Sequence, residues 1–101
     1  MTLARSKKVR NSAKGQNCTL RIYQVCNHNP ETVVYAHVGS AGGVGMKCGD
    51  NMGVYACSSC HDVIDGRINY PDGSYDFSAD ILRALEETQQ KLIDSGIMVI
   101  K

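Results

Sequence analysis

The sequence contains very few large aromatic side chains. Trp is absent, Phe occurs once, and aromatic residues make up 6% of the 101-residue chain. A chain of this length forms one small domain with a modest core, so the packing of large rings cannot be its main source of stability. We therefore expect a cross-link, such as a disulfide or a bound metal ion, to stabilise the fold.

Long apolar runs are also missing. Residues 1–14 are mostly basic and polar, unlike a secretory signal peptide, and no segment approaches the length of a transmembrane helix. These features favour an intracellular protein with no membrane partner. In a reducing compartment, the five cysteines are better interpreted as thiolate ligands of a metal ion than as disulfides.

Acidic residues are absent from the first 30 positions. Those positions carry six Lys and Arg side chains, whereas residues 31–101 carry five basic and ten acidic side chains. A basic segment of this kind can contact the phosphates of nucleic acid, or it can be a solvated leader. We predict that residues 1–14 form a basic, flexible leader and that residues 15–101 form a single domain without internal repeats.

Three strands are predicted in the first half of the chain. Apolar alternation and β-branched residues indicate strands over residues 18–23, 31–38 and 52–56. We expect the last two strands to pair in antiparallel fashion. The segment between them, residues 39–51, is rich in glycine and is predicted to be an irregular excursion.

Two helices follow the predicted strands. The first begins near Ser58 and ends at Gly66, and the second has Ser78 as its N-cap and ends at Gly96. An apolar stripe identifies the face of the second helix that we expect in the core: Ile81, Leu82, Leu85, Leu92 and Ile93. Residues 97–100 are expected to form a final strand, and the fold class is α+β.

Four cysteines are spaced like the ligands of a structural zinc site. Cys57 and Cys60 form a Cys-x-x-Cys pair at the start of the first predicted helix, and Cys18 and Cys26 close a turn-rich segment. Four thiolates can complete a tetrahedral Zn²⁺ site. Two alternatives stay open, namely buried cysteines without a ligand and a redox pair of Cys57 with Cys60. The redox pair fits poorly, because no βαβ pattern surrounds it.

Two further residues bear on this site. His28 follows Cys26 closely and is an alternative zinc ligand in place of a cysteine. Cys48 lies in the glycine-rich segment, away from the four predicted ligands. We interpret it as a free thiol without an assigned role.

A second set of residues can perform acid–base and metal chemistry. His37 ends a predicted strand, and an imidazole with a reference pKa of about 6.5 can accept a proton from water near neutral pH. His61 and Asp65 are four residues apart, so a helix places them on one face, where they can hold a divalent cation. Asp50 can orient His37 or hold the loop. The order strand, strand, helix can place His37 opposite the metal face of the helix.

The motifs around these residues resemble those of known nucleases. HNH, or ββα-metal, endonucleases are similar in three places: Ala36-His37-Val38, the glycine-rich segment with Met46-Lys47 and Asp50, and Cys57-Ser58-Ser59-Cys60-His61. The layout of residues 14–70 also resembles the small, prophage-borne YbcO family, whose members are assigned as nucleases.

This resemblance implies a small, zinc-stabilised ββα-metal (HNH-like) domain with an additional C-terminal helix. It implies that His37 is the general base, that His61 is a metal ligand and that Asp50 takes a position often held by Asn. Ala36 stands where many relatives have a second metal ligand, so Asp65 must supply more of the coordination. Lys47-Cys48 stands where relatives often have Lys-Pro, which changes the stiffness of the loop.

The resulting hypothesis is a metal-dependent DNA endonuclease of phage or prophage origin, located in the cytoplasm of the bacterial host. His37 activates water, and Mg²⁺ or another divalent cation held by His61 and Asp65 stabilises the transition state. Lys47 and Arg67 are predicted to contact phosphates. The alternative is a non-catalytic zinc-knuckle module that binds nucleic acid or a recombination or repair protein. Such a module has no need for His37, His61 and Asp65 together.

Overall fold

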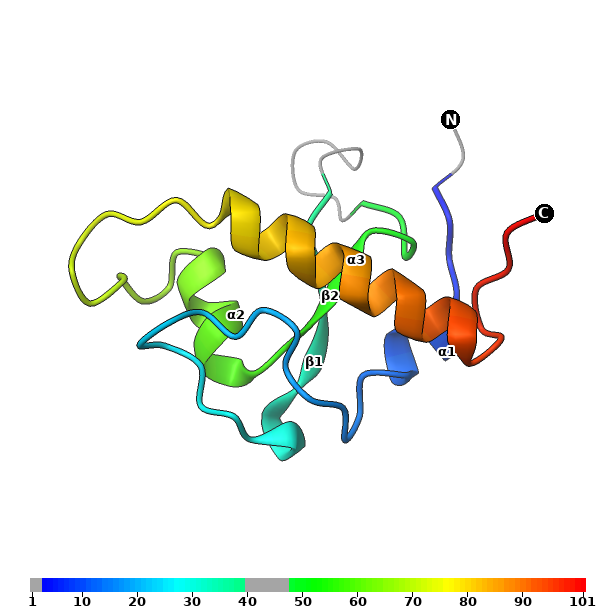
Figure 1. The fold of residues 1–101 in the computed structure, drawn as a ribbon, viewed down its shortest axis with the longest axis horizontal. Coiled ribbons are helices and arrows are strands. Elements are labelled where there is room, and N and C mark those ends of the chain that lie inside the picture. The colour runs from blue at the N-terminus through cyan, green and yellow to red at the C-terminus, as the bar shows by residue number, and fades with distance from the viewer. Residues whose placement is uncertain (1–2, 40–47) are drawn as a thin grey trace.

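The computed structural model describes residues 3–39 and 48–101, and within them it is a small α+β fold (Figure 1). A two-stranded antiparallel hairpin lies at its centre. In chain order, the elements are α1 (Lys7–Asn11), the 3-10 helix η1 (Pro30–Thr32), β1 (Val34–His37), β2 (Gly53–Ala56), α2 (Ser58–Ile64) and α3 (Ser78–Asp94). The predicted fold class is confirmed at this level.

The hairpin confirms the predicted pairing, although β1 is shorter than expected. The start of the predicted strand instead belongs to η1. The Asn29 side chain caps that short helix by accepting a hydrogen bond from the Glu31 N–H. In the hairpin, Val34 lies opposite Ala56 and His37 lies opposite Gly53. His37 therefore ends β1 at the far end of the hairpin from the junction between β2 and α2.

A close approach of an aromatic ring explains the glycine in β2. A Cβ atom added to Gly53 would lie 2.3 Å from two ring carbons of Tyr35. No side chain fits at this distance, so only glycine lets the Tyr35 ring lie across β2. The Tyr35 ring in turn meets the His37 ring edge-on, with 5.4 Å between the ring centroids.

The C-terminal helix α3 covers the hairpin and crosses β2 in Figure 1. It buries Ala84, Thr88 and Leu92. The Thr88 hydroxyl lies 3.0 Å from the Thr19 hydroxyl, so two buried polar groups satisfy one another. Leu82, which the predicted stripe placed in the core, is 60% exposed, and that part of the prediction is wrong.

The segment expected to be the first strand, residues 18–23, is irregular. Its apolar side chains are nevertheless core residues, since Leu20 and Ile22 are fully buried. Thr19 donates a backbone hydrogen bond to the Tyr55 carbonyl, at 2.7 Å, but Arg21 has a positive φ of 43°, which no extended strand contains. The alternation of apolar residues thus identified burial correctly and the conformation wrongly.

The two ends of the chain also differ from expectation. Residues 7–11, within the predicted flexible leader, form α1, which packs beside β1. Ser6 caps this helix by accepting a hydrogen bond from Val9, whose side chain is buried. Residues 97–100 form no strand, because the N–H groups of Ile97 and Met98 both bond to the Leu92 carbonyl and close the end of α3.

Within the residues that the structure describes, no helix is long and apolar enough to cross a membrane.

Candidate functional site

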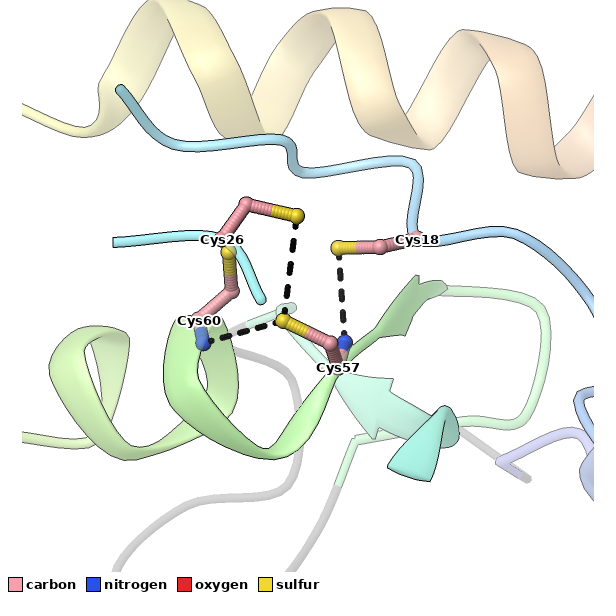
Figure 2. Close-up of side chains that lie close together, drawn as sticks. All are labelled: Cys18, Cys26, Cys57 and Cys60. Carbon is pink, nitrogen blue, oxygen red and sulfur yellow. Dashed lines mark hydrogen bonds between the residues drawn. The ribbon is translucent and has the colours of Figure 1, made fainter. Parts of the chain in front are cut away.

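Four cysteine sulfurs meet beside the start of α2 (Figure 2). Cys57 is the N-cap of α2, Cys60 lies in its first turn, and Cys18 and Cys26 come from the irregular segment under α3. The four sulfur atoms all lie within 4.8 Å of one another. A tetrahedral zinc ion with Zn–S bonds of about 2.3 Å separates its ligands by roughly 3.8 Å, and the Cys26 and Cys57 sulfurs are 3.9 Å apart. The four cysteines can therefore bind a metal such as zinc.

Backbone amides also point at these sulfurs. The N–H groups of Arg21 and Cys57 donate to the Cys18 sulfur, and the Cys60 N–H donates to the Cys57 sulfur. Such bonds favour thiolates over neutral thiols. The fold thus stabilises these sulfurs as negatively charged thiolates.

The thiols cannot all ionise without a cation. A hydrogen bond from Cys60 lowers the pKa of Cys18 to about 4, and the same bond raises the pKa of Cys60. Burial raises the pKa of Cys26 to about 11. A bound metal ion would stabilise the thiolates and so release the protons from Cys26 and Cys60.

His28 lies beside this cluster. Its Nδ1 is 3.7 Å from the Cys26 sulfur, so it can hydrogen-bond to a thiolate. The group of metal-binding side chains that the described residues bring together consists of the four cysteines. His28 is thus a hydrogen-bond partner of Cys26 next to the four sulfurs, and it does not take the place of a cysteine ligand.

His37 and Asp50 form a second, separate arrangement at the other end of the hairpin. The Nε2 atom of His37 lies 2.7 Å from Oδ1 of Asp50. The other carboxylate oxygen of Asp50 accepts from the Ser6 N–H at 2.7 Å and from Nη1 of Arg10 at 2.6 Å. The Asp50 side chain is only 3% exposed, so all of its hydrogen bonds come from the protein.

This environment keeps Asp50 ionised. Burial alone would raise the pKa of its carboxyl group, but the hydrogen bonds from His37, Ser6 and Arg10 outweigh burial and lower that pKa to about 2. Its backbone is fixed as well, because Asp50 N–H donates to the Ala4 carbonyl and the Tyr35 hydroxyl donates to the Asp50 carbonyl. Asp50 is thus a fixed, negatively charged acceptor for one nitrogen of His37.

A cavity of about 170 Å³ opens beside this pair. Its lining consists of Arg5, Arg10, His37, Cys48 and Asp50. Sequence reasoning missed the two arginines at this site. The run of bases before residue 15 is the available signal, and it allows either a phosphate contact or a solvated leader.

Cys48 also lies at this cavity. It is buried, and its sulfur accepts a hydrogen bond from Gly39 N–H at 3.2 Å. It is a free thiol, as predicted. It takes no part in the four-sulfur group.

His61 and Asp65 are neighbours on the surface of α2, as the four-residue spacing predicts. His61 Nε2 lies 3.0 Å from Asp65 Oδ2. Arg67, a predicted phosphate contact, is occupied by intramolecular pairs, at 2.9 Å from Asp62 and 3.0 Å from Asp65. Lys47, the other predicted contact, lies outside the described residues.

The described residues do not assemble a second group of three or more metal ligands. His61 and Asp65 offer two side chains to a cation. No hydrogen bond or ion pair within residues 3–39 and 48–101 joins them to His37. The structure thus contains two separate histidine–aspartate pairs and one sulfur cluster.

Comparisons with known proteins place this arrangement in context. A family model described as "Putative nuclease YbcO" matches residues 7–96. Two relatives carry the same name, one from Escherichia coli K12 and one from Enterobacteria phage 82. Each is 39% identical over 92 residues, which cover 89% of this chain and 95% of the relative.

A solved structure is also similar. It is titled "Structure of a putative bacteriophage protein from Escherichia coli str. K-12 substr. MG1655", and it matches with a TM-score of 0.72 and 35% identity. The match covers 88% of this chain and 100% of that one. Both the sequence match from α1 to the end of α3 and this shared fold lead to one assignment: the chain belongs to the YbcO family.

Proposed function

We propose that this protein is a metal-dependent DNA endonuclease that hydrolyses phosphodiester bonds, with His37 as its general base. The observation that carries the proposal is the 2.7 Å contact between His37 and the buried Asp50 carboxylate, beside a cavity with two arginines. The family name of the relatives, nuclease, agrees with this chemistry. An HNH-like arrangement of the hairpin and α2 is part of the proposal.

The chemistry of His37 follows from its partner. Because the Asp50 carboxylate only accepts hydrogen bonds, it fixes the proton of His37 on Nε2. Nδ1 is then the unprotonated nitrogen, and it can take a proton from an attacking water molecule. The Asp50 charge also stabilises the imidazolium that results. The His37 side chain is 12% exposed, so it can reach water in the cavity.

We assign the catalytic cation to His61 and Asp65 on α2. A divalent cation such as Mg²⁺ held there would have to reach the phosphate attacked by the water that His37 activates, where it would stabilise the charge on the phosphorane and on the departing 3′ oxygen. His61 and Asp65 would exchange their mutual contact for the cation, and Arg67 would exchange its pair with Asp65 for a phosphate. The four cysteines would hold a structural zinc.

The test is plasmid nicking with added Mg²⁺ or Mn²⁺. We expect the parent protein to nick and His37→Ala and His61→Ala to lose at least 10²-fold in rate, a typical contribution of acid–base catalysis. Both variants should keep their zinc and their DNA affinity. Lys91→Gln changes a side chain on α3, outside the proposed site, and serves as the control. Equal nicking by the parent and His37→Ala would contradict the proposal.

The second candidate is a non-catalytic module that binds nucleic acid or a recombination or repair protein. The pairing of His61 with Asp65 and of Arg67 with both neighbouring carboxylates favours it, since these groups already satisfy one another. DNA binding without nicking in any divalent metal would support this candidate.

A further inference from the structure

The cavity beside His37 has the dimensions and the charge of a phosphate site. Its volume of about 170 Å³ equals roughly six water molecules at about 30 Å³ each, enough for one phosphate group and some solvent. Its charged lining contains the guanidinium groups of Arg5 and Arg10 and the carboxylate of Asp50. Positive charge therefore exceeds negative charge around the cavity.

Both arginines retain hydrogen-bond donors. Arg5 uses Nη1 to bond to the carbonyls of Ala4 and Cys48, and Arg10 uses Nη1 to bond to Asp50. Among the described residues, the Nε and Nη2 atoms of both side chains make no hydrogen bond. A guanidinium carries five N–H groups in a planar fork that matches the oxygens of a phosphate. The unused donors are those that a phosphate would engage.

The segment that carries these arginines is anchored at the site. Asp50 N–H donates to the Ala4 carbonyl at 2.8 Å, and Ser6 N–H donates to the Asp50 carboxylate at 2.7 Å. The buried Val9 side chain then fixes α1 against the body. Arg5 and Arg10 are therefore placed before any ligand arrives, which reduces the entropic cost of binding.

We propose that Arg5 and Arg10 form a phosphate-binding site that holds the DNA backbone next to His37. The proposal rests on the endonuclease function proposed above, because the phosphate belongs to the strand that His37 attacks. The segment predicted to be a leader would thus form one wall of the active site. Arg10 would have a second role as a positioning residue, since the same guanidinium holds Asp50 in contact with His37.

Equilibrium binding tests this site without any cleavage. A fluorescent duplex is titrated with the zinc-loaded protein in the absence of other divalent metals, at several salt concentrations. We expect Arg5→Gln and Arg10→Gln each to weaken binding about tenfold at low salt. Each should also reduce the slope of log K against log [salt] by about 0.9, the value for one phosphate contact. Lys91→Gln removes one charge from α3 and is the matched control.

Cleavage separates the roles of the two arginines. At saturating DNA, we expect Arg10→Gln to lose more of the cleavage rate than Arg5→Gln, because it removes both a phosphate contact and the hydrogen bond that holds Asp50. Arg10→Lys should restore part of the binding but less of the rate, because an ammonium group lacks the planar fork that can hold Asp50 through Nη1 and a phosphate through its other nitrogens.

The result that overturns the proposal is an affinity and a salt slope for Arg5→Gln that equal those of Lys91→Gln. Arg5 forms no ion pair among the described residues, so its replacement tests binding even if Arg10→Gln fails to fold. A protein that binds DNA through Arg5 but never nicks would contradict the proposed endonuclease and leave the phosphate site supported. The binding experiment thus tests the phosphate site, and the nicking experiment tests the endonuclease independently of it.

Discussion

His37 Nε2 and Asp50 Oδ1 lie 2.7 Å apart. The Asp50 carboxylate is almost completely buried, and its other oxygen accepts hydrogen bonds from Arg10 and Ser6. The two residues are separated by 13 positions in the sequence, and Asp50 lies near the end of the glycine-rich segment. This contact orients the imidazole ring, and in the proposed mechanism it places the proton on Nε2. The first two predictions depend on it.

Asp50→Asn is expected to reduce nicking on the order of 10²-fold. The amide cannot supply the negative charge that stabilises protonated His37, and its NH₂ group can donate to the imidazole and favour the wrong tautomer. DNA affinity should change much less than the rate, because the Asp50 carboxylate does not contact the phosphate in the proposed complex. Single-turnover cleavage and duplex titration measure the two effects. An unchanged rate would show that Asp50 has no role in orienting the base.

The lowered pKa of Asp50 predicts that the stability of the fold depends on pH. Its pKa is lowered from an ordinary value of 3.8 to about 2 in the folded protein. A lowered pKa means that the stabilisation is complete above about pH 4 and is lost as the pH falls towards 2. The shift corresponds to about 2 kcal/mol.

Urea unfolding of the parent and Asp50→Asn at several pH values measures this contribution. The difference in unfolding free energy between the two proteins should shrink by about 2 kcal/mol between pH 5 and pH 2. Zinc loading must be matched at each pH, because acid also protonates thiolates. A constant difference across this range contradicts the prediction.

The four cysteines predict one zinc ion per chain. Removal of zinc should unfold the region around α2, because structural zinc contributes about 10–16 kcal/mol in small domains, as much as the whole stability of a typical protein. Elemental analysis and thermal unfolding with and without a chelator measure this effect. Cys57→Ser should lose the metal, and Cys48→Ser, which changes a buried cysteine outside the cluster, should retain it. Equal metal loss in both variants would falsify this assignment.

Gly53→Ala is expected to destabilise the hairpin by about 1–3 kcal/mol. The new methyl group would meet the Tyr35 ring at 2.3 Å, so the ring would have to shift. A double-mutant cycle with Tyr35→Leu measures the effect, because the smaller side chain should remove most of the cost of the alanine. Additive free energies of unfolding would show that the Tyr35 ring is not the cause.

The sequence predicted those parts of the fold that depend on neighbouring residues. The β-branched residues before His37, the Cys-x-x-Cys pair and the spacing of His61 and Asp65 are local patterns. The structure contains the hairpin, the start of α2 at the cysteine pair and the shared helix face of His61 and Asp65 that they predict. Local patterns thus account for where these side chains lie, and the roles proposed for them stay predictions.

The parts that could not be predicted depend on contacts between distant residues. Arg10 meets Asp50 across 40 positions, and no local pattern indicates that a basic segment returns to a buried carboxylate. Residues 18–23 alternate like a strand, but the sulfur of Cys18 accepts hydrogen bonds from Arg21 and from Cys57, 39 positions away. The chain bends around that sulfur, and this tertiary contact overrides the local preference.

The Cys57 sulfur serves two purposes, since it belongs to the cluster and also accepts the Cys60 N–H that begins α2. Loss of a bound zinc ion, or an oxidant that links these thiols, would therefore remove the cap of the helix on which His61 is mounted. In the endonuclease proposed above, this loss would disturb the cation site on α2 and leave the contact between His37 and Asp50 in place.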